Sequence, residues 1–509
     1  MENSICITGI KGRSWNRSSR SDPDSGSSYR TCDYIQVPAY RTGTDNIRED
    51  HKRKFRDLRG EVTVYLTLVF VLFISLILTL MESASVQMAK NYRRADMNRA
   101  MECVFAEYQK ELLENYDLFA IEAGYETGSY NEQNILDRLA YYGADMENKV
   151  ERIQLYTDQN GELFMTQVGK YMKHKYGLAW ADRYLGNTSL WKNQEQKAGE
   201  LTETEIEQTN RLDELLGEQE MELPSEDNPM EHVEVLKKSP VLSLVMPEGT
   251  QVSEKSVELQ DMPENRTNQS GYGTFSDVDP EDGTVTAVLM GEYVLEHFAG
   301  FTDEHKGGSL DYELEYILAG KSSDKENLET VVKKLVLLRF VPNYIYLQSN
   351  SAKQAEARAA AGALCALLAV PAITEAATQG ILLAWAYGES LMDIRTLLSG
   401  RKVAISKDDT SWQLSLSGLM KLGTKEDVGS GTDVEGGLTY KDYVRMLLFL
   451  EGKEKMAVRT MGMIEKNMQS IYGQPSFRVD YCVGRMEVST TCKLRRGIQY
   501  RYKTYYGYR

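Results

Sequence analysis

The chain has 509 residues, 42% of them hydrophobic, and a formal net charge of −16. This length suffices for about three domain-sized units. The first 60 residues hold 12 Lys or Arg and 8 Asp or Glu, so the acidic excess belongs entirely to the rest of the chain. That excess argues against nucleic acid or anionic lipid as the main partner of the larger part.

Residues 62–81 are the strongest signal in the chain. They read VTVYLTLVFVLFISLILTLM and carry no charge. About 20 apolar residues cross the hydrocarbon core of a bilayer, so the run predicts one transmembrane helix. A basic cluster from Lys52 to Arg59 precedes it. Because Lys and Arg are retained on the cytoplasmic side, we expect a single-pass protein of the cell membrane with its bulk outside.

Residues 1–59 are rich in Ser, Arg, Gly and Asp and show no apolar period. This composition predicts a disordered, basic cytoplasmic tail. The alternative to an anchor is a signal peptide cleaved between Ala84 and Ser85. A signal peptide has an apolar region of only about 7 to 15 residues, which favours the uncleaved anchor.

Residues 82–198 are expected to form a helical stalk and the first part of the ectodomain. One apolar stripe follows helical spacing from the membrane outward. We expect it to pack on the protein's own head or on a neighbour. Its members are Met97, Met101, Val104, Phe105, Tyr108 and Leu112.

Residues 199–235 are predicted to be an acidic linker or a loose helical insertion. Twelve Asp or Glu and one base, Arg211, lie between residues 200 and 231. Two strand-like pieces follow, Val241–Met246 and Val252–Leu259, and then a loop over 264–283.

That loop contains Asp277, Asp279 and Asp282. Asp282 stands where a calcium loop of the EF-hand type requires Gly, so this class of calcium site is rejected. The sequence GKS at 320–322 lacks the upstream glycine of a phosphate loop, which gives nucleotide binding no support.

Residues 236–474 are predicted to be a mainly helical ectodomain core. Ser323 and Glu326 form a capping-box pair, and Pro342 is expected to kink or end the helix that follows. Ala359–Thr374 is Ala-rich and short, which favours a tightly packed core helix over a second membrane span.

Ile381–Leu398 continues as helix and carries a pair of carboxylates, Glu389 and Asp393, at i, i+4 spacing. Such a pair resembles an acid/base pair. We favour an ion-pair edge with Arg395 or Lys402 instead.

Thr439 and Asp442 are expected to cap a further helix, and Trp412–Leu416 alternates like a strand. Residues 475–509 predict a β-like, tyrosine-rich tail in which Cys482 and Cys492 could pair as a disulfide. Basic and aromatic residues alternate near the end of the chain. Single-stranded nucleic acid can bind such patterns, but an outer location favours an edge strand or a partner contact.

The cysteines and histidines do not cluster. No CxxC pair occurs, so no zinc site is expected, and Cys103 and Cys365 are expected to be small core residues. We expect no catalytic residues, no cofactor and no metal. The six cysteines and five histidines are Cys6, Cys32, Cys103, Cys365, Cys482 and Cys492, and His51, His174, His232, His297 and His305.

Four segments (59–84, 309–339, 389–407 and 437–450) resemble an uncharacterised family of single-pass membrane-anchored proteins from Gram-positive bacteria. The most distinctive of them reads SLDYELEYILAGKSSDKENLETVVKKLVLLR. Members of that family tend to be encoded near genes for tight-adherence (Flp-type) pilus assembly. The resemblance implies a pilus-associated role and supplies no catalytic residues.

The N-terminal segment also resembles, loosely, the minor pseudopilins of tight-adherence systems. In those proteins a prepilin peptidase cuts after a Gly that follows a basic residue, as Gly60 follows Arg59 here. The typical substrate has Glu at the fifth position after the cut, where this chain has Tyr65.

These observations predict an α+β, mostly helical fold. One N-terminal transmembrane helix continues into an extracytoplasmic helical domain with small β elements and a β-rich tail. We expect a structural or accessory component of a tight-adherence pilus or a related surface assembly, with membrane lipid and membrane proteins as partners and nucleic acid excluded. The alternatives are a surface binding module or adhesin, and a carboxylate-type hydrolase, which leaves little trace in sequence.

Overall fold

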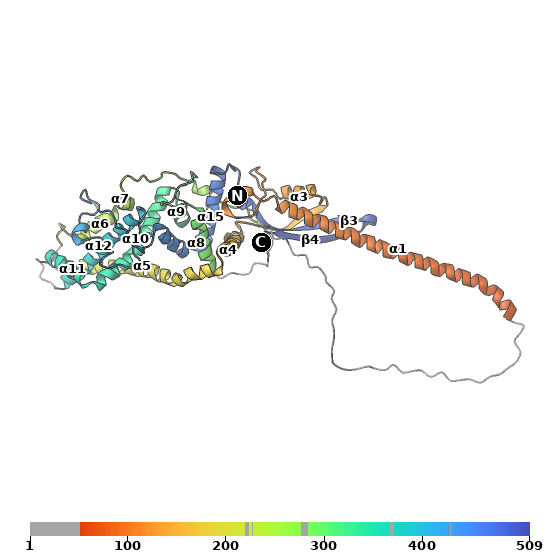
Figure 1. Cartoon of the computed structure of the whole chain (residues 1–509), viewed down its shortest axis with the longest axis horizontal. Helices are drawn as coiled ribbons and strands as arrows, with labels where there is room; N and C mark the ends of the chain where they lie inside the picture. The colour runs from red at the N-terminus through yellow and green to blue at the C-terminus, as the bar shows by residue number, and fades with distance from the viewer. Residues whose placement is uncertain are drawn as a thin grey trace, which may run out of the picture. The chain divides into compact units, whose positions relative to one another are not determined.

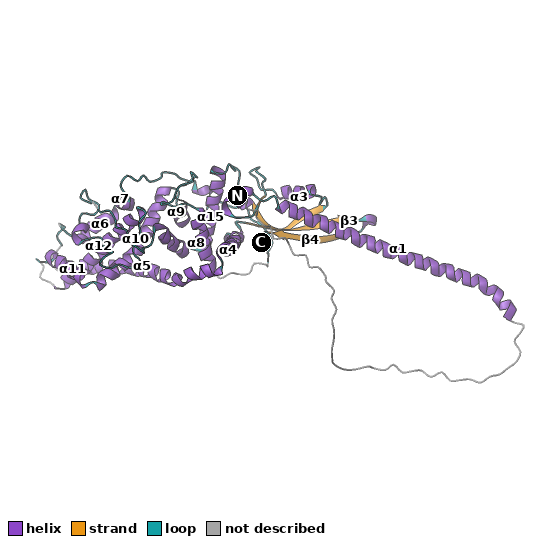
Figure 2. Cartoon of the chain, viewed as in Figure 1, coloured by secondary structure: helices purple, strands orange, loops and turns teal. Residues whose placement is uncertain are grey.

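The computed structural model describes residues 51–218, 223–225, 227–275, 283–366, 371–427 and 429–508. Helices dominate this part of the chain, and four strands form one small sheet (Figure 2). The mostly helical α+β class is therefore confirmed. Residues 1–50 of the predicted tail lie outside the described residues, and residues 51–59 belong to the first helix.

The described helices and strands follow in chain order. They are α1 (His51–Phe105), α2 (Lys110–Tyr116), β1 (Ile121–Glu122), α3 (Glu132–Tyr141), β2 (Glu147–Leu155), α4 (Glu162–Tyr176), α5 (Leu178–Glu218), α6 (Pro229–Lys238), α7 (Val241–Val245), α8 (Gly283–His297), α9 (Glu313–Ala319), α10 (Asp324–Ser349), α11 (Ser351–Leu364), α12 (Pro371–Leu398), α13 (Leu416–Leu419), α14 (Tyr440–Leu450), α15 (Lys453–Ser470), β3 (Cys482–Lys493) and β4 (Gln499–Gly507).

The chain divides into two compact units, residues 1–82 and residues 83–509. The described part of the first unit is the beginning of α1, where every side chain from Val62 to Met81 is exposed. Within the described residues, this helix is the one long and apolar enough to cross a membrane. The predicted apolar helix is confirmed, and the described parts of the Ala-rich rival, residues 359–366 and 371–374, contribute to no second candidate span.

The second unit contains the sheet, in which β3 is the central strand. β2 pairs antiparallel with β3 along Val483–Thr491, while β1 and β4 pair antiparallel with Cys482–Val483 and Arg485–Lys493. A strand has only two edges, so β1 and β4 share the edge opposite β2. The predicted β-rich C-terminal tail is thus a hairpin that organises the sheet.

One face of this sheet carries a hydrophobic cluster, here called the sheet core, which includes the last turns of α1. Its residues are Met97, Ala100, Met101, Val104, Phe105, Ile121, Ala123, Ile135, Leu139, Ala144, Val150, Ile153, Leu155, Val483, Met486, Val488, Cys492 and Tyr502. The stripe of α1 therefore packs on the protein's own head. The helix ends at Phe105, so Tyr108, 37% exposed, and Leu112 do not continue the same face as predicted.

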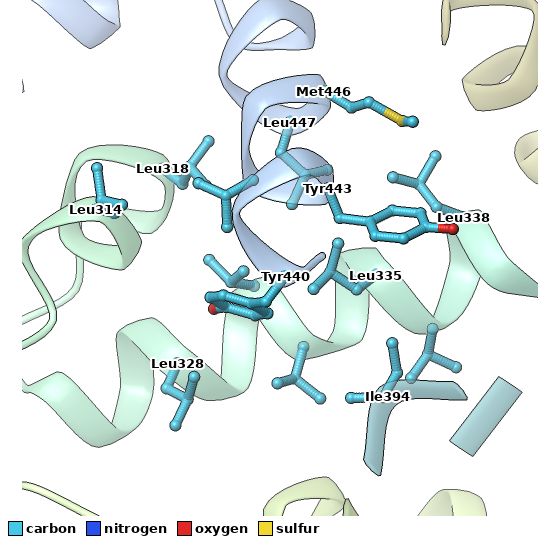
Figure 3. Packing of buried hydrophobic residues seen from close by; sticks show 14 of the residues in the cluster. Leu314, Leu318, Leu328, Leu335, Leu338, Ile394, Tyr440, Tyr443, Met446 and Leu447 are labelled. Carbon is cyan, nitrogen blue, oxygen red and sulfur yellow. The ribbon is translucent and has the colours of Figure 1, made fainter. Parts of the chain in front are cut away.

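The larger helical core is built around α10 and α12 (Figure 1). Figure 3 shows how α14 lies across α10: Tyr443 extends toward Leu338, and Leu314 and Leu318 of α9 lie on the other side of α14. Thr439 and Asp442 make both halves of the predicted capping box at the start of α14. Ser323 caps α10 by accepting the N–H of Glu326, which is one half of the predicted capping box, while the Glu326 carboxylate accepts from the Ser322 hydroxyl instead.

Three strand predictions are wrong. Val241–Val245 is the short helix α7. Residues 252–259 make one isolated bridge, between Ser256 and Ser323, and Trp412 and Leu414 lie in a loop before α13. Short apolar runs do not distinguish a buried strand from a buried helical turn, and these segments lie among helices with no free sheet edge to join.

The predicted helices of the centre also differ in their bounds. α10 continues through Pro342 to Ser349. Residues 359–364 of the Ala-rich segment end α11 and residues 371–374 begin α12, and α11 buries only Ala357 and Ala361. The described part of the segment is therefore not a tightly packed core helix. The acidic segment is helical up to Glu218, the end of α5, as in the helical alternative.

Cys482 and Cys492 are both free. They lie ten positions apart on the single strand β3, and a rise of about 3.3 Å per residue separates them by roughly 33 Å, far beyond disulfide range. Cys365 is buried as predicted, whereas Cys103 is half-buried.

Candidate functional site

Four charged side chains meet in the interior of the helical core, and we call them the buried ion cluster. They are Arg339 of α10, Glu389 and Asp393 of α12, and Lys407 of the loop that follows α12. None of their side chains is more than 1% exposed. The two positive and two negative charges balance, as a buried group of ions requires.

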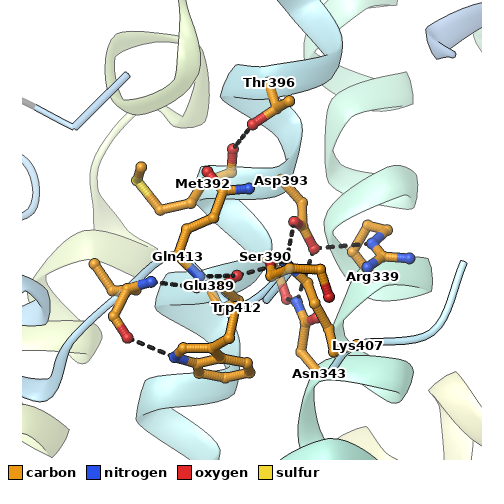
Figure 4. Close-up of polar contacts among 12 residues, drawn as sticks. Arg339, Asn343, Glu389, Ser390, Met392, Asp393, Thr396, Lys407, Trp412 and Gln413 are labelled. Carbon is orange, nitrogen blue, oxygen red and sulfur yellow. Dashed lines mark hydrogen bonds and ion pairs between the residues drawn. The ribbon is translucent and has the colours of Figure 1, made fainter. Parts of the chain in front are cut away.

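The geometry of the cluster follows from α12. Residues at i and i+4 share one face of a helix, so Glu389 and Asp393 both point at the loop carrying Lys407 (Figure 4). The Lys407 Nζ donates to Asp393 Oδ1 at 2.7 Å, to Glu389 Oε1 at 2.5 Å and to the Ser411 carbonyl at 3.0 Å.

The two carboxylates differ in their other partners. Asp393 Oδ2 accepts from Arg339 Nε at 2.9 Å and from Asn343 Nδ2 at 3.1 Å. Glu389 instead accepts two backbone N–H groups, those of Gln413 at 3.0 Å and Leu414 at 2.7 Å. Burial is the main cause that raises the pKa of Glu389 to about 7, against the attraction of Lys407, which lowers it.

The sequence correctly pairs Glu389 with Asp393 on one helical face, but the predicted ion-pair edge is wrong. Residues two apart on a helix do not face each other, and Arg395 points away from Asp393. Arg395 binds Asp427 instead, and the backbone N–H of Lys402 donates to Asp433. The sequence does not identify Arg339 and Lys407 as partners, because residues so far from Glu389 along the chain leave no local pattern.

A second group combines Asp117, Glu296 and His297, whose ligand atoms lie within 4.8 Å of one another. The Glu296 carboxylate already accepts from Lys175 and from the Tyr176 hydroxyl. The ring of His297 faces the Tyr293 carbonyl and Asp117 Oδ2, at 2.9 and 3.3 Å. These ion pairs and hydrogen bonds account for the group. Asp277, Asp279 and Asp282 lie outside the described residues.

Two surface hollows lie away from the buried ion cluster. A polar one of about 680 Å³ opens at the start of α15, and an aromatic one of about 550 Å³ opens where α1 ends beside β4. Arg266 is one of the residues that line the polar hollow, and its guanidinium is paired with Glu465 and Asp480. The aromatic hollow is lined by Glu102, Phe105, Ala106, Tyr108, Phe119, Tyr505, Tyr506, Gly507 and Tyr508.

Comparison with known proteins finds one family. The model of a family of unknown function (DUF5702) matches residues 219–494, which is more than half of the chain. The chain belongs to this family. The DUF5702 segment contains the whole buried ion cluster and β3, but neither α1 nor β4. No curated protein and no solved structure matches the chain. The predicted membership of an uncharacterised family is thereby confirmed.

Proposed function

We propose that this protein is a membrane-anchored structural or accessory component of a bacterial surface assembly of the tight-adherence pilus type. The observation that carries the proposal is the apolar part of α1, of which 0% is buried although its composition is that of a membrane span. Exposed apolar surface of this size is costly in water, so a bilayer is the environment that fits it. The folded unit of residues 83–509 is then the anchored part.

Charge supports the orientation that we propose. The basic residues from Lys52 to Arg59 precede the span and would keep residues 1–59 in the cytoplasm. The folded unit would then face the outside of a Gram-positive cell. The resemblance of residues 309–339 to proteins encoded beside tight-adherence genes supports a role in that assembly.

Membrane lipid and other membrane proteins are the partners that we propose. Small polar side chains favour close helix association in a bilayer. Thr67, Ser75 and Thr79 each donate a hydroxyl hydrogen bond to a carbonyl of their own helix, which leaves the hydroxyl oxygens able to accept from a second helix.

We propose no turnover of an external substrate. A glycosidase needs two carboxyl groups flanking an open substrate site. Glu389 and Asp393, the pair considered for that chemistry, are instead 0% exposed and paired with cations. This burial favours a structural role for the pair over a hydrolytic one.

A gene deletion tests the proposal. The deletion strain should lose surface filaments or adhesion, and a plasmid copy of the full-length gene should restore them. A second copy, in which an unrelated membrane span replaces residues 62–81, tests whether membrane anchoring alone restores the filaments or whether specific contacts of this helix are also needed. Normal filaments in the deletion strain, together with a turnover activity of the purified protein, would contradict the proposal.

A further inference from the structure

We propose that the buried ion cluster is a self-processing site, in which the Lys407 side chain condenses with the Glu389 carboxyl group to form an intramolecular isopeptide bond. The inference is independent of the proposed surface function. It rests on the arrangement of three groups, an amine, a carboxyl group and a second carboxylate, in contact inside the helical core and shielded from water.

The nucleophile is already in position. The Lys407 Nζ contacts Oε1 of Glu389 and Oδ1 of Asp393, at 2.5 and 2.7 Å. Contacts this close replace a bimolecular encounter by an intramolecular one, and well-oriented intramolecular reactions reach effective molarities of roughly 10⁵ to 10⁸ M. The long side chain of Lys407 is held at its end by a third contact, with the Ser411 carbonyl.

Glu389 is the acceptor of the new bond, and Asp393 is the base. The guanidinium of Arg339 and the amide of Asn343 both donate to Asp393 Oδ2, which holds negative charge on that carboxylate. An ionised carboxylate is a poor electrophile but a competent proton acceptor. Glu389 has Lys407 as its one cationic hydrogen-bond partner among the described residues, so after proton transfer it can exist as the neutral acid.

Backbone donors stabilise the developing charge on Glu389. The N–H of Leu414 lies 2.7 Å from Oε2, and the N–H of Gln413 lies 3.0 Å from Oε1. Preorganised N–H groups directed at a carboxyl group act as an oxyanion hole when the nitrogen attacks the carbon. Oε2 would remain as the amide oxygen, and Oε1, beside Lys407, would leave.

The reaction balances without any other reagent. The Lys407 ammonium transfers protons to the carboxylates, and the Nζ lone pair forms the bond to Glu389 Cδ. The C–Oε1 bond breaks with its electron pair on oxygen, which leaves as water after receiving two of the three ammonium protons, one of them relayed by Asp393. One N–H remains on the new amide and can still donate to Asp393 or to the Ser411 carbonyl.

Burial favours the product. The side chains of Lys407, Glu389 and Asp393 are 1%, 0% and 0% exposed. Exclusion of water removes the reagent for the reverse hydrolysis and strengthens each polar contact in the cluster. The amide also replaces two buried charges by one neutral group, which removes part of the desolvation cost of the ion pair. The bond would tie α12 to the loop over a separation of 18 residues.

Peptide mapping of the full-length protein, purified from membranes in detergent and then denatured, tests the proposal. We expect trypsin to leave the bond after Lys407 uncut. We also expect a branched peptide that joins Lys407 to Glu389 and is lighter than its two parts by one water. Unmodified Lys407 with normal cleavage would overturn the proposal. A branch from Lys407 to Asp393 would overturn the assignment of the acceptor and the base.

Variants test the roles separately. Asp393→Asn keeps the nucleophile and the acceptor, and we expect at least a tenfold lower fraction of linked protein. Lys402→Met, at an exposed lysine of the same loop, should leave the link intact. The wild-type peptide map decides the proposal even if Asp393→Asn fails to fold. A fully linked and folded Asp393→Asn protein would overturn the role of Asp393 as the base.

Discussion

The carboxyl group of Glu315, on α9, lies entirely in the protein interior, and no Lys or Arg of the described residues forms an ion pair with it. It accepts the Tyr440 hydroxyl at 2.6 Å and the Phe301 N–H at 3.0 Å, while Oε2 has no hydrogen-bond partner among the described residues. Burial raises the pKa of Glu315 from 4.5 to about 7. The folded state therefore holds this proton over a pH range in which the unfolded chain releases it.

Glu315 should make the protein less stable as the pH rises from about 4.5 to about 7. In that window the folded state binds more protons than the unfolded state. The contribution of Glu315 to the free energy of unfolding therefore falls, by up to about 1.4 kcal/mol per pH unit. Above pH 7 this contribution stays constant. Glu315→Gln keeps the shape and cannot ionise. In denaturant unfolding we expect the variant to gain on the order of 2 to 3 kcal/mol over the wild type between pH 5 and pH 8.

Glu326→Gln, at an exposed residue near the start of α10, is the control and should leave the difference between pH 5 and pH 8 unchanged. The interpretation fails if Glu315→Gln and the wild type lose the same free energy over this range.

At the scale of residues, the sequence predicts local pairings and misses distant ones. The capping residues Thr439 and Asp442 are three positions apart, and helix geometry alone brings them together. Glu389 and Asp393 are likewise recognisable as neighbours. Their partner Lys407 comes from a loop whose path depends on how the whole core packs, and periodicity carries no information about that path.

Among the elements, the cap of α14 gives a local test. The Thr439 hydroxyl accepts the N–H of Asp442, and Asp442 accepts the N–H of Thr439. Thr439→Ala should lower the free energy of unfolding by about 1 kcal/mol, because it leaves an N–H at the helix end without its partner. Thr439→Ser retains the oxygen and should cost much less. Equal losses for both variants, measured by denaturant unfolding, would show that the cap contributes nothing specific.

The end of α1 is the element with the strongest expected effect. Met101 and Phe105 are 0% and 1% exposed, and Phe105 contacts the rings of Tyr506 and Tyr508. Phe105→Ala should destabilise the protein by about 3 to 5 kcal/mol through the cavity that it leaves. Tyr108→Ala, at a side chain 37% exposed, is the control and should cost far less.

Thermal unfolding of the two variants measures the difference. If Phe105→Ala unfolds like the wild type but no longer crosslinks to a membrane partner, the apolar stripe at the end of α1 forms an interface with that partner and not with the protein's own core.

Long helices and strands whose apolar residues repeat with a regular period can be predicted from the sequence, whereas short elements cannot. The apolar run of α1 and the alternating C-terminal hairpin each contain enough residues to define a period. The five residues of α7 fit a strand as well as a helical turn, and the surroundings decide between them. Pro342 is tolerated inside α10 because the core on both sides holds the helix together, which a local propensity does not describe.

At the scale of the whole molecule, the division after Glu82 predicts where the protein can be cut. A fragment of residues 83–509 should remain in solution without detergent and fold, because it lacks the exposed apolar run and keeps the whole sheet core. A fragment beginning at residue 107 should aggregate or unfold, since it lacks Met97, Met101 and Phe105. Circular dichroism and gel filtration distinguish the two. A folded 107–509 fragment would show that the end of α1 is dispensable.

Topology is tested by thiol labelling of intact cells. Thr267→Cys places a thiol at an exposed residue of the folded unit, in a protein whose Cys6, Cys32 and Cys103 are changed to Ser. A membrane-impermeant reagent should label it on intact cells if that unit lies outside. The control keeps Cys32 and Thr267 and should react only after lysis. The reverse pattern would invert the orientation.

The position of β3 has a consequence for the order in which the protein is made. The sheet core needs Met97–Phe105, and also Val483–Val488 and Tyr502, which are synthesised much later. Domains generally fold in the order of synthesis, but this cluster has no central strand until β3 has left the ribosome. The apolar face of the last turns of α1 therefore stays exposed until β3 is synthesised. A nascent chain that stops before residue 482 would keep this face exposed, and chaperones and proteases could bind it.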